Sequence, residues 1–99
     1  MIKHIVFWRL NGENAERRKA QAQEIKTVLE ALNGRINGLR KLEIGIDFSD
    51  TPSSAHVVLY SELDSREALA AYQTHPEHVK AAAVVKAAAS ERQLVDYEI

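Results

Sequence analysis

The sequence predicts an α+β protein in which a four-stranded antiparallel sheet carries its helices on one face. Three observations predict it. Residues 2–10 alternate in hydrophobicity with the period of a strand, and residues from about 14 to 32 carry apolar side chains at helical spacing. Two further strands, a broken helical region and a last strand follow. The resulting order, β-α-β-β-α-β, folds as one sheet layer against one helix layer.

The first strand is apolar on both faces in its middle. Val6 and Trp8 point to one side, and Ile5 and Phe7 point to the other. Because helices can cover only one face, the face of Ile5 and Phe7 needs a different cover. Pairing with a second copy would remove it from water, so we expect a homodimer formed through the sheet face.

The later elements follow from local signals. Asn33-Gly34 ends the first helix, and Asp64 with Glu67 forms a capping-box signature for the next one. His75-Pro76 interrupts that helix, because proline suits the first turn of a new helix. We therefore expect strands at 39–47, about 55–63 and 91–98, a loop at 50–54, a short helix after Asp64 and a second helical piece at about 76–89.

The composition limits the function classes. The chain has 99 residues, which we interpret as a single domain spanning 1–99, and its 13 basic and 14 acidic residues leave a net charge of −1. That balance argues against nucleic acid as a partner. No apolar run or leader-like segment suggests a membrane span or secretion, and with no cysteine we expect a cytoplasmic protein without Cys-based metal sites.

Three stretches carry a resemblance to a known family. They are the opening Met1–Val6, the segment Ala70–His78 with its Tyr-x-x-His-Pro-x-His element, and the closing Val95-Asp96-Tyr97. In that order and at those separations they resemble the stress-responsive A/B barrel (Dabb) family over nearly the whole chain. The resemblance implies a ferredoxin-like subunit of a dimeric α/β barrel. It also implies relatives that include plant stress proteins, cofactor-free oxygenases and a plant polyketide cyclase.

Two histidines are expected to flank one cavity between helices and sheet. His4 shares the helix-facing side of the first strand, and His78 shares a helix face with Val85. Similarity to the polyketide cyclase implies His78 as general base, Tyr72 as its partner and oxyanion stabiliser, and His4 as a polar group of the pocket. No metal or organic cofactor is required for such chemistry.

We expect aliphatic groups and one indole to surround a small apolar ligand in this cavity. In place of aromatic residues of the cyclase, the chain has aliphatic side chains on its first helix and alanines at the end of the last one. The predicted lining residues are Val6, Trp8, Ile25, Leu29, Val58 and Val85.

Structural roles are the alternatives for the same residues. His4 could be a core histidine bonded to backbone, His75 a helix cap, and His56 a solvent-facing residue. Trp8 is better explained as core than as a substrate platform. His75-x-x-His78 has metal-ligand spacing but no third ligand nearby, so we predict no metal site.

The sequence leaves three functions open. One is a small-molecule pocket protein acting as a cofactor-independent cyclase or lyase. The second is a non-catalytic, dimeric stress-response scaffold, and the third is a cofactor-free monooxygenase. Fold alone does not choose among them, so whether the protein is an enzyme depends on the geometry of the pocket.

Overall fold

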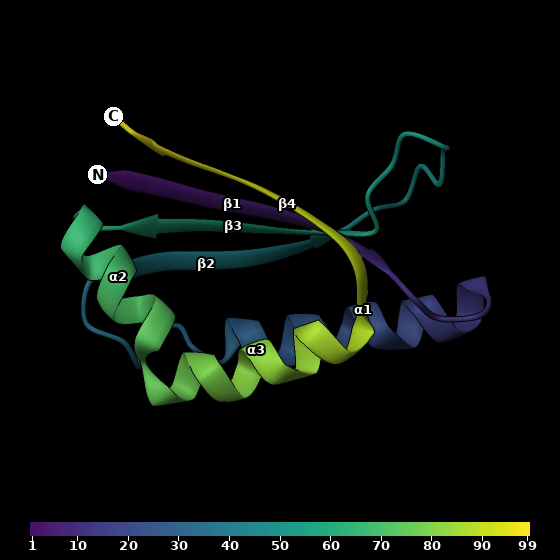
Figure 1. The fold of residues 1–99 in the computed structure, drawn as a ribbon, viewed down its shortest axis with the longest axis horizontal. Helices are drawn as coiled ribbons and strands as arrows, with labels where there is room; N and C mark the ends of the chain where they lie inside the picture. Colours follow the sequence, from purple (N-terminus) through teal and green to yellow (C-terminus); the bar gives the residue numbers. More distant parts are fainter.

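The computed structural model describes residues 1–99 and has the predicted order of elements (Figure 1). The second helical region is split in two at His75-Pro76, as the sequence predicts. The elements are β1 (Ile2–Leu10), α1 (Ala15–Glu30), β2 (Leu39–Ile46), β3 (Val57–Leu63), α2 (Arg66–Thr74), α3 (Pro76–Ala88) and β4 (Ala89–Glu98).

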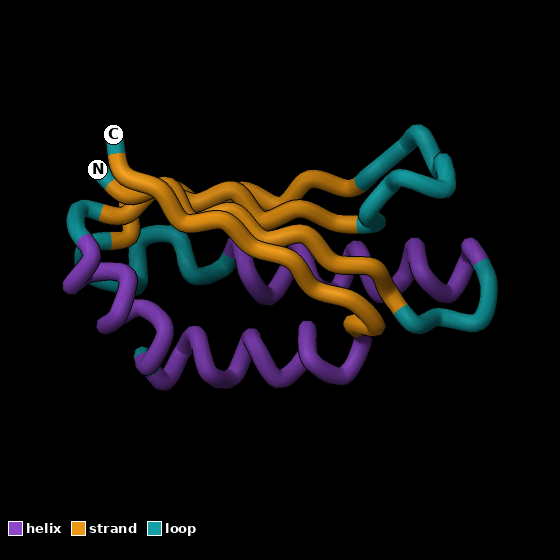
Figure 2. The backbone as a smooth tube through the Cα atoms, turned by 45° about the horizontal axis from the view of Figure 1, so that its top comes forward, coloured by secondary structure: helices purple, strands orange, loops and turns teal.

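The four strands form one sheet in the order β2-β3-β1-β4, and every neighbouring pair is antiparallel. All three helices lie in a single layer on one side of it (Figure 2). The predicted fold class is therefore confirmed. None of the helices is long and apolar enough to cross a bilayer.

Side-chain caps determine where the helices begin. Asn14 accepts a hydrogen bond from the backbone N–H of Arg17 at 2.8 Å. The cap of α2 is Ser65, whose hydroxyl accepts from Ala68 at 3.1 Å, so the predicted Asp64 cap is wrong by one residue. The carboxylate of Asp64 is instead bonded by Arg40 of β2.

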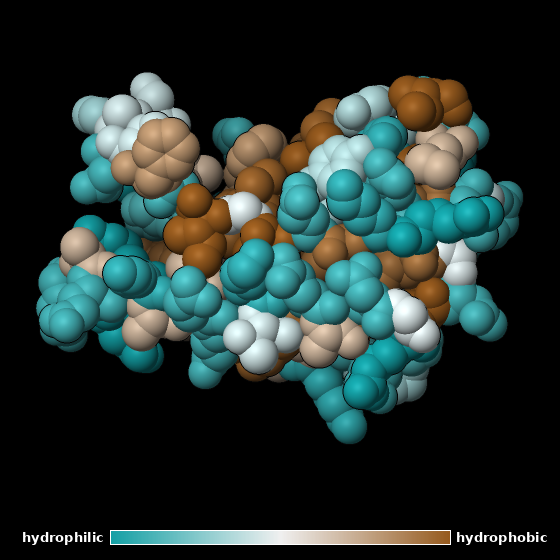
Figure 3. Space-filling model, turned by 180° about the vertical axis from the view of Figure 1, so that it is seen from behind, coloured by the Kyte–Doolittle hydropathy of each residue, from teal (hydrophilic) through white to brown (hydrophobic).

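The core lies between the two layers. Alternate residues of β1 and β3 are buried against the helices, and α1 contributes Ile25 and Leu29, both almost completely inaccessible. Seen from behind, hydrophobic side chains show in several patches across the middle of the molecule, separated by hydrophilic ones (Figure 3). This alternation directs His4, Val6 and Trp8 into the space between sheet and helices.

The opposite face of the sheet is only partly shielded. Phe7, Val95 and Tyr97 are 42–49% exposed there, and Ile5 sits among them opposite Val95. Strand β4 differs from the others because all of its residues after Ala89 are exposed. The helices thus cover β1, β2 and β3, and leave β4 open on both of its faces.

His56 does not face solvent freely, which corrects the expectation for this residue. Its ring is half-buried, and Nδ1 accepts a hydrogen bond from the backbone N–H of Leu10 at 2.8 Å. The backbone N–H of His56 donates to the carbonyl of Trp8 at 2.9 Å, which extends the pairing of β1 beyond the first residue of β3. The sequence pattern placed His56 on a strand from about residue 55, whereas β3 begins at Val57 and the partners of His56 lie on β1, where no local pattern reveals them.

Lowering the pH should destabilise the protein in part through His56. Burial lowers the pKa of this imidazole below its ordinary 6.5, and Arg9 and Arg18 lower it further against the smaller opposite effect of Asp50 and Asp47. The unfolded chain then takes up the proton more readily, so stability is lost as the pH falls below 6.5.

The measurement is the melting temperature (Tm) across this pH range for wild type and His56→Asn. The amide oxygen can still accept from Leu10, but it does not titrate. We expect the variant to lose less stability on acidification. Identical pH dependence in both proteins would show that His56 plays no part in it.

Candidate functional site

A cavity of about 260 Å³ lies between the sheet and the helices, on the side where β4 is uncovered. Its wall is mostly apolar, with a few polar side chains among the lining residues. The lining residues are His4, Val6, Trp8, Leu29, Leu59, Tyr72, Gln73, His78, Val79, Ala82, Val85, Lys86, Ala89 and Arg92. All three predicted catalytic residues are therefore brought to one hollow.

His4 is held in one tautomer by a carboxylate. It is buried on β1, and its Nδ1 lies 2.5 Å from Oδ1 of Asp96 on β4. The antiparallel register pairs these two residues directly across the strands. Since an ionised carboxylate can only accept, Nδ1–H donates to it, and in the neutral imidazole Nε2 is then the acceptor. His4 is thus bonded to a side chain, whereas the structural alternative required a bond to backbone.

His78 is positioned by the turn between α2 and α3. Its Nδ1 lies 3.2 Å from the carbonyl oxygen of Gln73, which accepts the ring N–H and leaves Nε2 as an acceptor. Burial lowers the pKa of this imidazole below 6.5; the Gln73 bond opposes the shift, while His4 and Lys86 add to it through their charges. His78 is therefore neutral at pH 7 and suited to accept a proton.

Tyr72 lies beside both histidines with its hydroxyl unbonded. The side chain is completely buried, and its oxygen has no hydrogen-bond partner within the chain. Its ring centroid is 4.3 Å from that of His78 and 6.2 Å from that of His4. Burial raises the pKa of the phenol well above its ordinary value, so it keeps its proton and can only donate or accept a hydrogen bond.

The structure places four of the six predicted lining residues at the cavity: Val6, Trp8, Leu29 and Val85. It does not place Ile25 there, because this side chain is fully enclosed in the core. Val58 is also absent, because its register with Phe7 turns it to the opposite face of the sheet. Its neighbour Leu59 takes the expected position.

The sequence pattern did not predict a role for Asp96 or Gln73. Strand alternation could have suggested Asp96, because this acidic residue shares the helix-facing side of the last strand with Leu94 and lies across from His4. Gln73 acts through its backbone carbonyl, so its side chain carries no signal for that contact. Nowhere in the chain do three His, Cys, Asp or Glu side chains gather closely enough to hold a metal ion.

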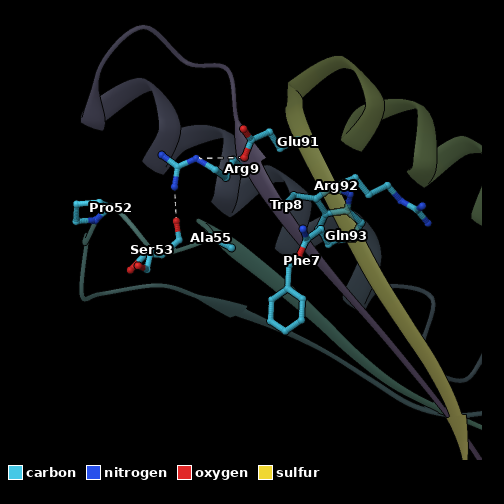
Figure 4. A pocket seen from close by; sticks show the side chains of 10 residues that line it. Phe7, Trp8, Arg9, Pro52, Ser53, Ala55, Glu91, Arg92 and Gln93 are labelled. Atoms are coloured by element: carbon cyan, nitrogen blue, oxygen red, sulfur yellow. Dashed lines mark hydrogen bonds and ion pairs between the residues drawn. The ribbon is translucent and has the colours of Figure 1, made fainter.

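A second, larger hollow of about 590 Å³ lies beside the loop that precedes β3 (Figure 4). Arg9 crosses it, donating to the carbonyl of Ser54 and lying 3.7 Å from the carboxylate of Glu91. Its wall is mostly polar and contains no histidine or tyrosine. We therefore assign the candidate site to the smaller cavity.

The match to a family model covers residues 2–99 and is described as the stress responsive A/B barrel domain. The chain belongs to the stress responsive A/B barrel domain family. The resemblance inferred from the opening, central and closing stretches is thereby confirmed. Because one fold can carry many unrelated activities, membership does not choose the reaction.

Three relatives of this A/B barrel protein have no assigned function. An uncharacterized protein of Streptomyces coelicolor is 33% identical over 81 residues, 79% of each chain. A dimeric protein of unknown function and ferredoxin-like fold from Bacteroides fragilis is 34% identical with a TM-score of 0.87, covering 99% of this chain and 95% of that one. A dimeric ferredoxin-like protein from Thermobifida fusca is 26% identical with a TM-score of 0.85, covering 99% and 90%.

Two enzymes share the fold of the A/B barrel chain at lower identity. A hydroxynitrile lyase from Passiflora edulis is 17% identical with a TM-score of 0.76, covering 99% of this chain and 92% of that one. An antibiotic biosynthesis monooxygenase is 15% identical with the same TM-score, covering 100% and 98%. These similarities establish the fold alone.

Replacing Tyr72 with phenylalanine should stabilise the protein. A buried hydroxyl without a partner costs roughly 1 kcal/mol or more, so Tyr72→Phe should raise Tm by about 4–8 °C in a domain of this size. Tyr60→Phe is the matched control, since that hydroxyl bonds Lys3 at 2.5 Å and Glu62 at 2.6 Å. The control should lower Tm, and a fall in both variants would contradict the assignment of Tyr72.

Proposed function

We propose that this protein binds a small apolar carbonyl compound in the cavity and acts on it as a cofactor-independent lyase or cyclase. The observation that carries the proposal is the buried, unbonded hydroxyl of Tyr72, whose ring lies near two imidazoles at the wall of a cavity. Buried polar groups are almost always hydrogen-bonded. A ligand oxygen at this position would give the hydroxyl its missing partner.

Tyr72 serves as the hydrogen-bond donor to that oxygen. Because burial raises its pKa, it stays protonated and stabilises negative charge that develops on the carbonyl oxygen. The apolar wall formed by Val6, Leu29 and Val85 keeps water away, which strengthens this interaction.

His78 serves as the base. Its Nε2 removes a proton from the carbon next to the carbonyl, and the electrons of the C–H bond move into an enolate whose oxygen is held by Tyr72. In ring closure, the enolate carbon attacks a second carbonyl and the new alkoxide takes the proton back from His78. In the lyase direction the same steps run in reverse, with no oxidant or cofactor.

His4 completes the site as an oriented acceptor. Asp96 holds Nδ1–H, so Nε2 can accept from a hydroxyl of the ligand.

Proton abstraction can be measured without knowing the natural substrate. Straight-chain methyl ketones are incubated in D₂O, and deuterium incorporation next to the carbonyl is followed by NMR. His78→Ala should lower the exchange rate by about 10²–10⁴-fold. The rate of wild type should fall as the pH drops through the lowered pKa of His78, because the protonated imidazole is no longer a base.

His75→Asn is the matched control. His75 caps α3 by accepting from Glu77 at 3.1 Å and does not line the cavity, so the amide preserves the cap and the rate should match wild type. If His78→Ala exchanges the ketones as fast as wild type, the base assignment is wrong.

The sheet face supports a second part of the proposal, a homodimer. Phe7, Val95 and Tyr97 expose nearly half of their side chains around Ile5 on one surface, and solved relatives of the family are dimeric. A second copy laid on this surface would remove it from water.

Adjacent residues of β4 provide a matched test. Val95 lies on this sheet face and is 49% exposed, whereas Leu94 lies on the helix-facing side and is 44% exposed. Val95→Glu should convert the dimer to monomer in light scattering, because it buries a charge at the interface, and Leu94→Glu should not. A dimer that survives Val95→Glu would place the contact elsewhere.

A further inference from the structure

The charges that line the cavity are all of one sign. Of its lining residues only Lys86 of α3 and Arg92 of β4 are charged at pH 7, and neither Asp nor Glu is among them. Both cations are exposed, so they lie at the solvent side of the hollow, while Tyr72 and His4 are buried at its inner wall. The cavity therefore has a polar inner end and a positive mouth.

Neither cation has an acidic partner in the chain. The six ion pairs of the structure involve other residues. The residues three and four positions before and after Lys86 are alanines and one serine, so no carboxylate lies within one turn of it along the chain. The neighbouring carboxylate, Glu91, lies 3.7 Å from Arg9, and in Figure 4 Arg92 leaves β4 in a direction away from both of them.

The helix dipole accounts for only one of these charges. Lys86 lies in the last turn of α3, where a cation is favourable. Arg92 lies on a strand and gains nothing from a helix terminus. Its cross-strand partner is Trp8, an apolar residue of the cavity wall, so no charge on β1 explains it.

We propose that the ligand is an apolar carboxylate, whose acidic group pairs with Lys86 and Arg92 at the mouth while its body extends inward toward Tyr72. This inference rests on the proposed function of the same cavity and names the class of molecule that it takes. The apolar wall between the two ends, including Val79 and Val85, suits an alkyl or aryl body. An arginine can hold a carboxylate through two parallel N–H bonds, and a lysine adds a point charge.

Matched ligands separate charge from size. Straight-chain carboxylates from butyrate to decanoate are compared by titration calorimetry at low ionic strength with the primary amide of each chain length. At the best chain length we expect the acid to bind about tenfold more tightly than the amide, a difference typical of a charged hydrogen bond. Added salt should reduce the affinity for the acid and leave that for the amide unchanged.

Two double variants with the same change in net charge complete the test. Lys86→Gln/Arg92→Gln should remove the preference for the acid while retaining amide binding. Lys80→Gln/Arg35→Gln is the control, because these cations border a shallow groove between α1 and α3 away from the cavity, and it should behave as wild type.

Each outcome decides between the two claims. Equal binding of acid and amide, or a preference that survives in Lys86→Gln/Arg92→Gln, would overturn the carboxylate inference and leave the pocket proposal standing. Binding of neither ligand series at any chain length would overturn both. Tighter binding of the acid than of the amide in wild type, lost in Lys86→Gln/Arg92→Gln and kept in Lys80→Gln/Arg35→Gln, would support both.

Discussion

The pairing of β1 with β4 is the constraint on which the candidate site depends. This register sets His4 directly opposite Asp96 and turns both to the helix-facing side. The 2.5 Å contact between them fixes which imidazole nitrogen carries the proton. A shift of β4 by one residue would turn Asp96 to the opposite face of the sheet and would separate it from His4.

The turn at His75-Pro76 fixes the other half of the site. Proline prevents α2 from continuing, and the cap formed by His75 starts α3 in a new direction. Tyr72 is thereby held at the end of one helix and His78 at the start of the next, with their ring centroids 4.3 Å apart. A continuous helix would present these residues six positions apart, on different faces.

Two polar groups of the site, the Tyr72 hydroxyl and the His78 imidazole, do little to stabilise the fold. The Tyr72 hydroxyl lacks a partner, and burial disfavours the charged form of His78. By contrast, Tyr60 on the opposite face has its hydroxyl bonded to both Lys3 and Glu62. Unsatisfied groups gathered at one cavity are what a binding site requires, because the ligand then supplies the missing interactions. Lys86 and Arg92 at the mouth likewise lack an acidic partner, which a charged ligand could supply.

The sequence by itself determined the order of elements, the faces of β1 and the family. It did so because hydrophobic periodicity and proline are local signals, and because the Tyr-x-x-His-Pro-x-His element is specific. Only the tertiary structure decided that Asp96 bonds His4, that Ile25 is sealed in the core and that Val58 faces away. Those facts depend on strand register and on the depth of packing, which arise from contacts between residues far apart in the chain. His56 and Asp64 illustrate the same limit, since their partners lie on β1 and β2 and no local pattern reveals them.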